Sequence, residues 1–403
     1  MKTIYRRHPA LRLAILRCDI FSLRFSEIEK NGSSRFINSG CNYFSSLNYV
    51  CMKPLNQIRF NHGWVLATLF TLAFSACNKS IDVPVKTDDK SLNAKAGPGH
   101  QEQTKALLVA GLEELQGSTV GPDEALYVTA PLAGTIWRIN PKSGAMTIFT
   151  TGLPKRNPDP FFQGGGVIDV AFRGGTAYAL VTGVASDLDP GRTDIVGIYR
   201  VDGPDSYTII ADLGAWSIAH PPLSDHFVPT GWQFSFESYR DGFIVNDGHH
   251  NRMLYVTLDG GITEVIALAN VVPTGLALRG NTIYFTQAGP IPHLPEHARL
   301  MSLSPKSPIA TEVASAAGLD VGLFVDVEFG SGNTLYTLAQ GIWDGVFEGE
   351  PALPNTGALL KLMPNGTFSV IEDGLNQPTS MEIIGNTVYV VSLAGDVWEI
   401  KKL

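Results

Sequence analysis

The chain has 403 residues, of which 44% are hydrophobic and 17% are charged, with 41 Gly and 25 Pro. This length and composition support a sizeable folded core and exclude a disordered, collagen-like or coiled-coil protein. The net charge of -8 is unevenly distributed, because residues 1–76 carry +7 and residues 77–403 carry -15. A body this acidic repels phosphate backbones, so we expect no nucleic-acid partner.

The first recognisable element is a targeting segment at residues 52–76. Lys53 and Arg59 precede a largely apolar run of 13 residues, 64–76, which ends in small side chains. A basic region, an apolar region and small residues in this order are typical of a secretory signal peptide. The apolar run is shorter than the roughly 20 residues that a membrane-spanning helix requires. The sequence therefore predicts cleavage and export.

Cys77 directly follows the small residues of this segment. Ser75, Ala76 and Cys77 resemble a bacterial lipobox, in which the cysteine thiol receives a diacylglyceryl group. A lipid chain on Cys77 would hold the protein at a membrane surface. This predicts a bacterial lipoprotein of the cell envelope, facing the periplasm or the outer surface, with the lipid as its one contact with the membrane. An ordinary secretory signal with an incidental cysteine is the alternative.

Two further segments precede the folded body. Residues 1–51 are basic and come before a complete signal, so they are either an overlong start assignment, with Met52 as the first residue, or a cytoplasmic extension. Residues 77–103 are polar and contain Gly and Pro, which predicts a flexible tether behind the lipidated cysteine. All four cysteines lie at or before position 77, so residues 104–403 contain neither disulfides nor thiolate chemistry.

Residues 104–403 are built from one repeated pattern. Residues 273–284 and 378–389 match almost position by position, and related copies lie at 117–127, 167–178, 229–245 and 325–336. Each copy contains a short apolar run, a Gly- or Asn-containing turn and a second apolar run that begins at an aromatic residue. This arrangement is typical of a β-hairpin.

Each copy is followed by a second hairpin, as at residues 135–149, which gives four strands per repeat at the roughly 40–50-residue spacing of propeller blades. The last repeat has three strands and ends at 397–400, and residues 106–111 resemble its missing fourth. The sequence therefore predicts an all-β fold, a six-bladed β-propeller of four-stranded blades over residues 104–403. An N-terminal strand completes the last blade and removes an open sheet edge. We expect a monomer.

Long connections between strands mark one end of this ring as the candidate binding surface. Blade topology places residues 154–166, 183–196, 214–228, 287–299 and 340–357 at the same end, and insertions on one face of a repeat fold usually build its binding site. We expect a small-molecule, glycan or protein ligand there. Packing of the loops onto the rim is the alternative role of the candidates. The candidate ligand-binding residues are Trp216, His220, His226, His249, His250, Trp343, Phe347 and Glu348.

Two acidic residues are candidate metal ligands. Asp169 and Asp326 lie near the starts of the inner strands of blades two and five, which face each other across a six-bladed ring. Carboxylates in this position could share one divalent cation such as calcium in the channel. Alternatively, they hydrogen-bond neighbouring backbone. We expect no other cofactor.

Three runs of residues resemble a known family. The run GPDEALYV at 121–128, the run DVAFRGG at 169–175 and the segment 247–261 are similar to the ScyD/ScyE-type β-propeller family, which is related to NHL-repeat and gluconolactonase-like propellers. The resemblance implies an exported propeller without a generally established reaction. In gluconolactonase-like hydrolases a metal is held by an inner-strand Glu, two Asn and an Asp. Gln116, Thr230 and Thr274 stand where that Glu and the two Asn are expected.

The sequence leaves two hypotheses about function. The favoured one is a lipid-tethered binding module without catalysis, which presents its loop-rich end to a ligand outside the cytoplasm. The alternative is an extracytoplasmic metal-dependent lactonase or esterase, with Asp169 and Asp326 as metal ligands and a loop histidine as general base.

Overall fold

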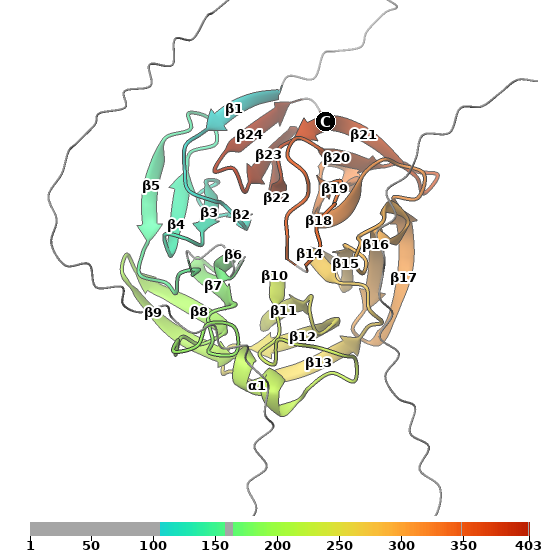
Figure 1. Cartoon of the computed structure of the whole chain (residues 1–403). Helices are drawn as coiled ribbons and strands as arrows, with labels where there is room; N and C mark the ends of the chain where they lie inside the picture. Colours follow the sequence, from blue (N-terminus) through green and yellow to red (C-terminus); the bar gives the residue numbers. More distant parts are fainter. Residues whose placement is uncertain (1–104, 158–163, 348, 402) are drawn as a thin grey trace, which may run out of the picture. The chain divides into compact units, whose positions relative to one another are not determined.

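The computed structural model describes residues 105–157, 164–347, 349–401 and 403. These residues form six antiparallel four-stranded sheets arranged around a central axis (Figure 1). The all-β six-bladed propeller that the repeats predict is therefore confirmed. Within the described residues, no helix has the length and apolar character needed to cross a membrane.

Five blades follow the chain order from the inside of the ring outward. Blade 1 contains β2 (Ser118–Val120), β3 (Leu126–Ala130), β4 (Thr135–Ile139) and β5 (Met146–Thr150). Blade 2 contains β6 (Gly166–Arg173), β7 (Thr176–Thr182), β8 (Gly197–Gly203) and β9 (Ser206–Asp212). Blade 3 contains β10 (Gln233–Tyr239), β11 (Gly242–Asp247), β12 (Arg252–Thr257) and β13 (Ile262–Ala267). Blade 4 contains β14 (Pro273–Arg279), β15 (Thr282–Gln287), β16 (Arg299–Ser304) and β17 (Ser307–Ser315). Blade 5 contains β18 (Gly322–Phe329), β19 (Leu335–Gly341), β20 (Gly357–Leu362) and β21 (Phe368–Leu375).

Blade 6 joins the two ends of the described chain. It contains β22 (Pro378–Ile384), β23 (Thr387–Ser392), β24 (Val397–Lys401) and, as its outer strand, β1 (Lys105–Val109). β1 pairs antiparallel with β24, so that Lys105 lies opposite Ile400 and Val109 lies opposite Val397. The predicted closing strand is thus confirmed, and it covers the edge that β24 would otherwise expose.

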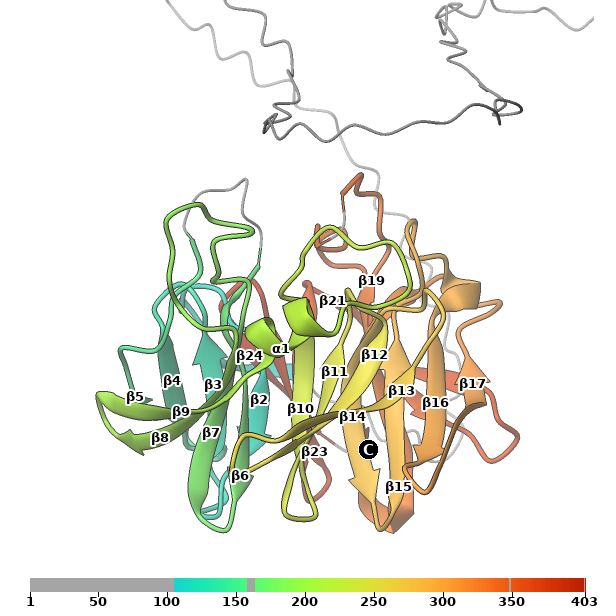
Figure 2. The ribbon, with the colours of Figure 1, turned by 90° about the horizontal axis from the view of Figure 1, so that it is seen from below.

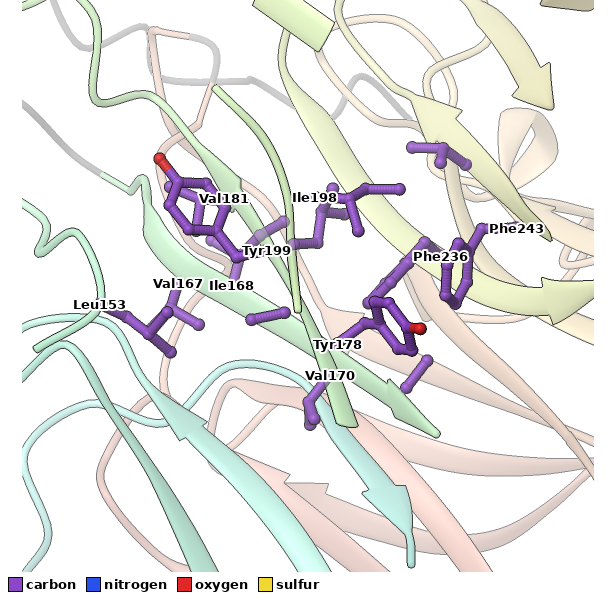
Figure 3. Close-up of a cluster of buried hydrophobic side chains, with 14 of the residues drawn as sticks. Leu153, Val167, Ile168, Val170, Tyr178, Val181, Ile198, Tyr199, Phe236 and Phe243 are labelled. Carbon is purple, nitrogen blue, oxygen red and sulfur yellow. The ribbon is translucent and has the colours of Figure 1, made fainter. Parts of the chain in front are cut away.

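The hydrophobic core lies between neighbouring blades. All five residues of β3 are buried, whereas the outer strand β9 exposes its first four residues, because the inner strands are covered on both faces. Figure 3 shows the cluster in which side chains of blade 2 pack against Phe236 and Phe243 of blade 3. The Tyr178 ring lies 4.8 Å from the Phe243 ring, measured between centroids.

The aromatic residue at the start of each repeat's second strand has a common packing role. Tyr127 contacts Phe172 of the next blade at 4.7 Å between ring centroids, and Tyr284 contacts Phe329 of the next blade at 5.3 Å. Edge-to-face aromatic pairs of this kind stabilise the fold by more than the apolar area that they bury accounts for. The aromatic position that defines the repeat in the sequence therefore seals one blade against the next.

Candidate functional site

The long connections lie at one end of the ring, as the topology predicts (Figure 2). They include α1 (Leu213–Ala219), between β9 and β10, and η1 (Pro295–His297), between β15 and β16. The β19–β20 connection spans residues 342–356. The hairpin turns at the other end are much shorter, with two residues between β6 and β7 and between β10 and β11. We call the end with the long connections the loop face.

A buried ion pair supports the loop face at blade 3. Asp247 ends β11 and Arg252 begins β12, and the two residues lie opposite each other in the hairpin. Arg252 Nε lies 3.2 Å from Asp247 Oδ2, and both side chains are almost completely buried. Arg252 also donates to Ser217 Oγ at 2.9 Å and to the His220 carbonyl at 2.7 Å. The guanidinium therefore fastens α1 and the start of the following loop to blade 3.

Two histidines in the turn between Asp247 and Arg252 hold the later part of the β9–β10 connection. His249 Nε2 accepts the backbone N–H groups of Phe227 and Val228 at 3.0 and 3.1 Å. His250 Nε2 lies 2.9 Å from the Val228 carbonyl, which assigns a proton to that nitrogen. Both histidines are buried, so they position the β9–β10 connection from beneath. 

Electrostatics keep the carboxylate of this cluster ionised. Burial by itself would raise the pKa of Asp247, but the hydrogen bond from His250 and the charges of His250 and Arg252 outweigh it and hold the pKa below its usual range. Asp247 Oδ1 also accepts the Trp232 N–H at 3.0 Å. The cluster is therefore a paired, hydrogen-bonded charge within the fold.

The remaining predicted ligand-binding residues divide into two groups. Trp216 stacks on His220 with 4.4 Å between ring centroids, and His226 packs edge-to-face on His250 at 5.1 Å, so these side chains gather around the blade 3 cluster. Trp343 lies on the separate β19–β20 connection and is buried against His293, at 5.0 Å.

Phe347 and Glu348 complete the predicted set. Phe347 lies on the β19–β20 connection with its side chain 71% exposed. Glu348 lies outside the described residues, and so does Cys77. The ligand-binding role of Glu348 and the lipidation of Cys77 stay predictions.

The two predicted metal ligands lie in the central channel and hydrogen-bond backbone across the blades. Asp169 Oδ2 accepts the N–H of Phe236 in the next blade at 3.0 Å, and its Oδ1 accepts the Val170 N–H at 2.8 Å. Asp326 repeats this arrangement with Met381, at 2.7 Å, and Val327, at 2.8 Å. All four carboxylate oxygens thus accept backbone N–H groups that are not used in the hydrogen bonds between strands.

Glycines in the neighbouring blades leave space for these two carboxylates. A Cβ on Gly117 would lie 2.4 Å from Asp169 Oδ1, and a Cβ on Gly275 would lie 2.8 Å from Asp326 Oδ1. The same pair, a glycine in one blade and an aspartate in the next, therefore occurs on opposite sides of the ring. In the part of the chain that the structure describes, no three His, Cys, Asp or Glu residues gather closely enough to hold a metal ion. The metal role of the aspartates stays a prediction.

Three glutamates line the channel further from the loop face. Glu237, Glu328 and Glu382 each lie two positions beyond the channel-facing residue of their inner strand, where the side chain points to the same side. Burial and then repulsion by Asp326 raise the pKa of Glu237 to about 7, and burial with repulsion by the other channel acids raises those of Glu328 and Glu382 well above their usual range. 

The aspartates share this acidic surrounding. Burial raises the pKa of Asp326 to about 7 and that of Asp169 well above its usual range, although both accept backbone hydrogen bonds that oppose the shift. The channel encloses a cavity of about 30 Å³, and one water needs about 10–15 Å³. The channel can therefore hold water or a small ion but not a larger ligand.

The Asp247–Arg252 pair and the three glutamates were not predicted from the sequence. Opposite charges placed symmetrically about the 248–251 turn were a signal for the pair, because hairpin partners face each other. The alternation Asp326-Val327-Glu328 was a signal for a second acidic layer, because residues two apart on a strand share a side.

Comparison with known proteins shows the fold. No protein-family model and no curated protein sequence matches this chain. Among solved structures, a gluconolactonase from Xanthomonas campestris is 9% identical, with a TM-score of 0.53 over 75% of this chain and 91% of that chain. A PQQ-bound aldose sugar dehydrogenase from Streptomyces coelicolor is 12% identical, with a TM-score of 0.51 over 74% and 98%. A Bacteroides thetaiotaomicron protein of unknown function is 11% identical, with a TM-score of 0.50 over 74% and 76%. 

These comparisons define the class of protein. The chain is a six-bladed β-propeller, similar in architecture to gluconolactonase-like propellers. At identities of 9–12% the likeness concerns the fold alone. 

Removing the buried guanidinium of blade 3 should destabilise the protein strongly. We expect Arg252→Met to lower the free energy of unfolding by about 3–5 kcal/mol, because the buried Asp247 carboxylate would lose the guanidinium charge and α1 would lose its hydrogen bond to blade 3. Urea denaturation measures the loss. The matched control is Arg299→Met, which removes an exposed ion pair with Glu312 and should cost less than about 1 kcal/mol. Equal losses in the two variants would contradict the structural role of the pair.

The channel carboxyls should make the protein less stable as the pH rises. Their pKa values are higher in the folded chain than the usual value of about 4, so the folded state binds more protons between about pH 4 and 7 and stability falls through that interval. We expect the Tm to fall by roughly 5 °C or more between about pH 5 and pH 8. Calorimetry should show a flatter profile for the double variant Glu328→Gln/Glu382→Gln. The exposed Glu113→Gln is the control, and an unchanged slope in the double variant would refute this assignment.

Proposed function

We propose that this protein is an exported, lipid-anchored β-propeller that binds a small molecule, glycan or protein through its loop face and does not catalyse a reaction. One observation carries this proposal: the long connections present large apolar side chains to solvent from a buried hydrogen-bonded support. Phe227 is 66% exposed while its backbone N–H is held by His249. Exposed apolar groups of this kind mark interaction sites.

The proposed anchor is compatible with this use of the loop face. β24 starts next to the β23–β24 connection at the loop face, and β1 runs antiparallel to it, so Lys105 lies on the side away from that face. A tether from a lipidated Cys77 would therefore join the propeller at the end away from the loop face and would not cover that face. We place the protein in the bacterial cell envelope on the strength of the signal-peptide pattern, and in the ScyD/ScyE-type family on the resemblance of its repeats.

A ligand screen that compares loop-face and control variants tests the proposed function. We expect one class among glycans, lactones and amphipathic small molecules to raise the Tm of the full-length protein by a few degrees. The double variant Phe227→Ser/Phe347→Ser should abolish this shift, because these side chains would form the contact. Ile309→Ser removes a side chain that is 72% exposed on β17 and should leave the shift intact.

A metal-dependent hydrolase is the second candidate, favoured by the acidic channel. Asp169 and Asp326 would then hold the ion and a loop histidine would act as general base. Mass spectrometry after equilibration with calcium and zinc and exhaustive dialysis measures the retained metal. About one ion per chain and hydrolysis of a lactone or ester, both lost in Asp169→Asn and Asp326→Asn, would overturn the binding-module proposal.

Cys77→Ser tests the anchor separately. We expect the wild-type chain to incorporate labelled palmitate and to sediment with membranes, and we expect the variant to do neither, because the serine hydroxyl cannot form the thioether. Secretion of an unlabelled wild-type protein would indicate an ordinary signal peptide and refute the lipobox.

A further inference from the structure

Three connections of the loop face expose nine large apolar side chains. The β9–β10 connection carries three of them, the β15–β16 connection two and the β19–β20 connection four. Phe227, Val346 and Phe347 are 66%, 72% and 71% exposed. The full set is Ile218, Leu223, Phe227, Ile291, Leu294, Ile342, Val346, Phe347 and Leu353.

The tips of two of these connections are held in fixed conformations. The Glu350 carboxylate accepts the backbone N–H groups of Val346 and Phe347, the latter at 2.9 Å. Trp343 Nε1 donates to the Glu350 carbonyl at 2.8 Å, which closes the same turn. On the β9–β10 connection the Phe227 ring packs edge-to-face on His249, at 4.4 Å.

This preorganisation matters for binding. A side chain that is already fixed loses little conformational entropy when a partner covers it. Rigid exposed aromatic residues are also the usual anchors of protein interfaces. The backbone at Val346 and Phe347 and the ring of Phe227 are held in this way, so Phe227 and Phe347 have the properties of contact residues.

The charge of the same connections is of one sign. Residues 213–232, 288–298 and 342–356 contain the acids Asp225, Glu296, Asp344, Glu348 and Glu350 and no Lys or Arg. The adjoining β17–β18 connection adds exposed Asp320. Acidic connections that also expose apolar side chains attract a cationic partner and repel an anionic lipid surface.

We infer that the loop face docks a basic segment of another protein, in which Lys or Arg side chains accompany large apolar ones. The apolar partner side chains would cover Phe227, Val346 and Phe347, and the basic ones would pair with the acidic side chains of the same connections. This inference rests on the proposed function, since it names the partner class for the same face.

Binding of synthetic peptides tests the inference. The probe is a short peptide in which Lys and Leu alternate, and the comparison peptides replace every Lys by Glu or every Leu by Ser. We expect the Lys–Leu peptide to bind the full-length protein at physiological salt and both comparison peptides to bind at least about tenfold more weakly, as measured by fluorescence anisotropy. 

Matched variants assign the binding to the loop face. Val346→Ser/Phe347→Ser should weaken binding of the Lys–Leu peptide about tenfold or more. Ile309→Ser, at an equally exposed position on β17, should leave this binding unchanged. Asp225→Asn/Asp344→Asn should weaken binding and reduce its salt dependence, and Asp205→Asn in the short β8–β9 turn is the control.

Three results would overturn the inference. They are equal binding of all three peptides, equal effects of the loop-face and control variants, and tighter binding of phosphatidylglycerol vesicles than of the Lys–Leu peptide. If the Lys–Leu peptide does not bind, while binding of a small molecule or glycan depends on Phe227 and Phe347, the basic-partner inference is wrong and the proposed function stands. If neither peptide nor screened ligand depends on these residues, both are wrong.

Discussion

Closure of the ring by β1 is the constraint on which the rest of this propeller depends. Each blade buries its two faces against its neighbours, so a ring that is open at one point leaves two apolar faces and a strand edge in water. Pairing of β1 with β24 joins the two ends of the described chain in one sheet, and Val109 is buried there with Val397 and Leu126. The other inter-blade contacts, such as Tyr127 with Phe172, seal a ring that this strand completes.

Closure also determines how polar groups are used along the axis. Each inner strand has no partner strand on the channel side, so some of its N–H groups are free of the sheet, and Asp169 and Asp326 accept two of these groups from the following blades. The channel carboxyls therefore contribute to cohesion between blades, at the cost of crowding acids that hold protons near neutral pH. The loop face has the opposite arrangement, since its buried polar groups, Arg252 and His249 among them, keep apolar side chains exposed. The channel therefore holds the blades together, whereas the loop face exposes apolar side chains, and the proposed function rests on this difference.

The sequence made the fold predictable because its repeats carry their own strand and turn signals. The Gly-Asn turn before Tyr284 and the matching turn before Tyr389 establish the hairpin, and the copies at regular spacing establish the number of blades. The candidate site was less predictable. Trp216, His220, His226, His249 and His250 were named individually, yet their gathering around Arg252 depends on α1 folding back over blade 3. Trp343 and Phe347 belong to another connection, and sequence spacing could not separate the two groups.

By itself the sequence determined the all-β class, the six blades, the closing strand and the end of the ring at which the long connections lie, because these follow from local periodicity and strand order. Only the tertiary structure decided that Asp169 and Asp326 hydrogen-bond backbone of the next blade, that Glu237, Glu328 and Glu382 share the channel with them, and that Arg252 is buried against Ser217 and His220 of the β9–β10 connection. The physical reason is that burial, pairing and repulsion between charges depend on distances between residues that are far apart in the chain. Those distances exist only once the ring has closed.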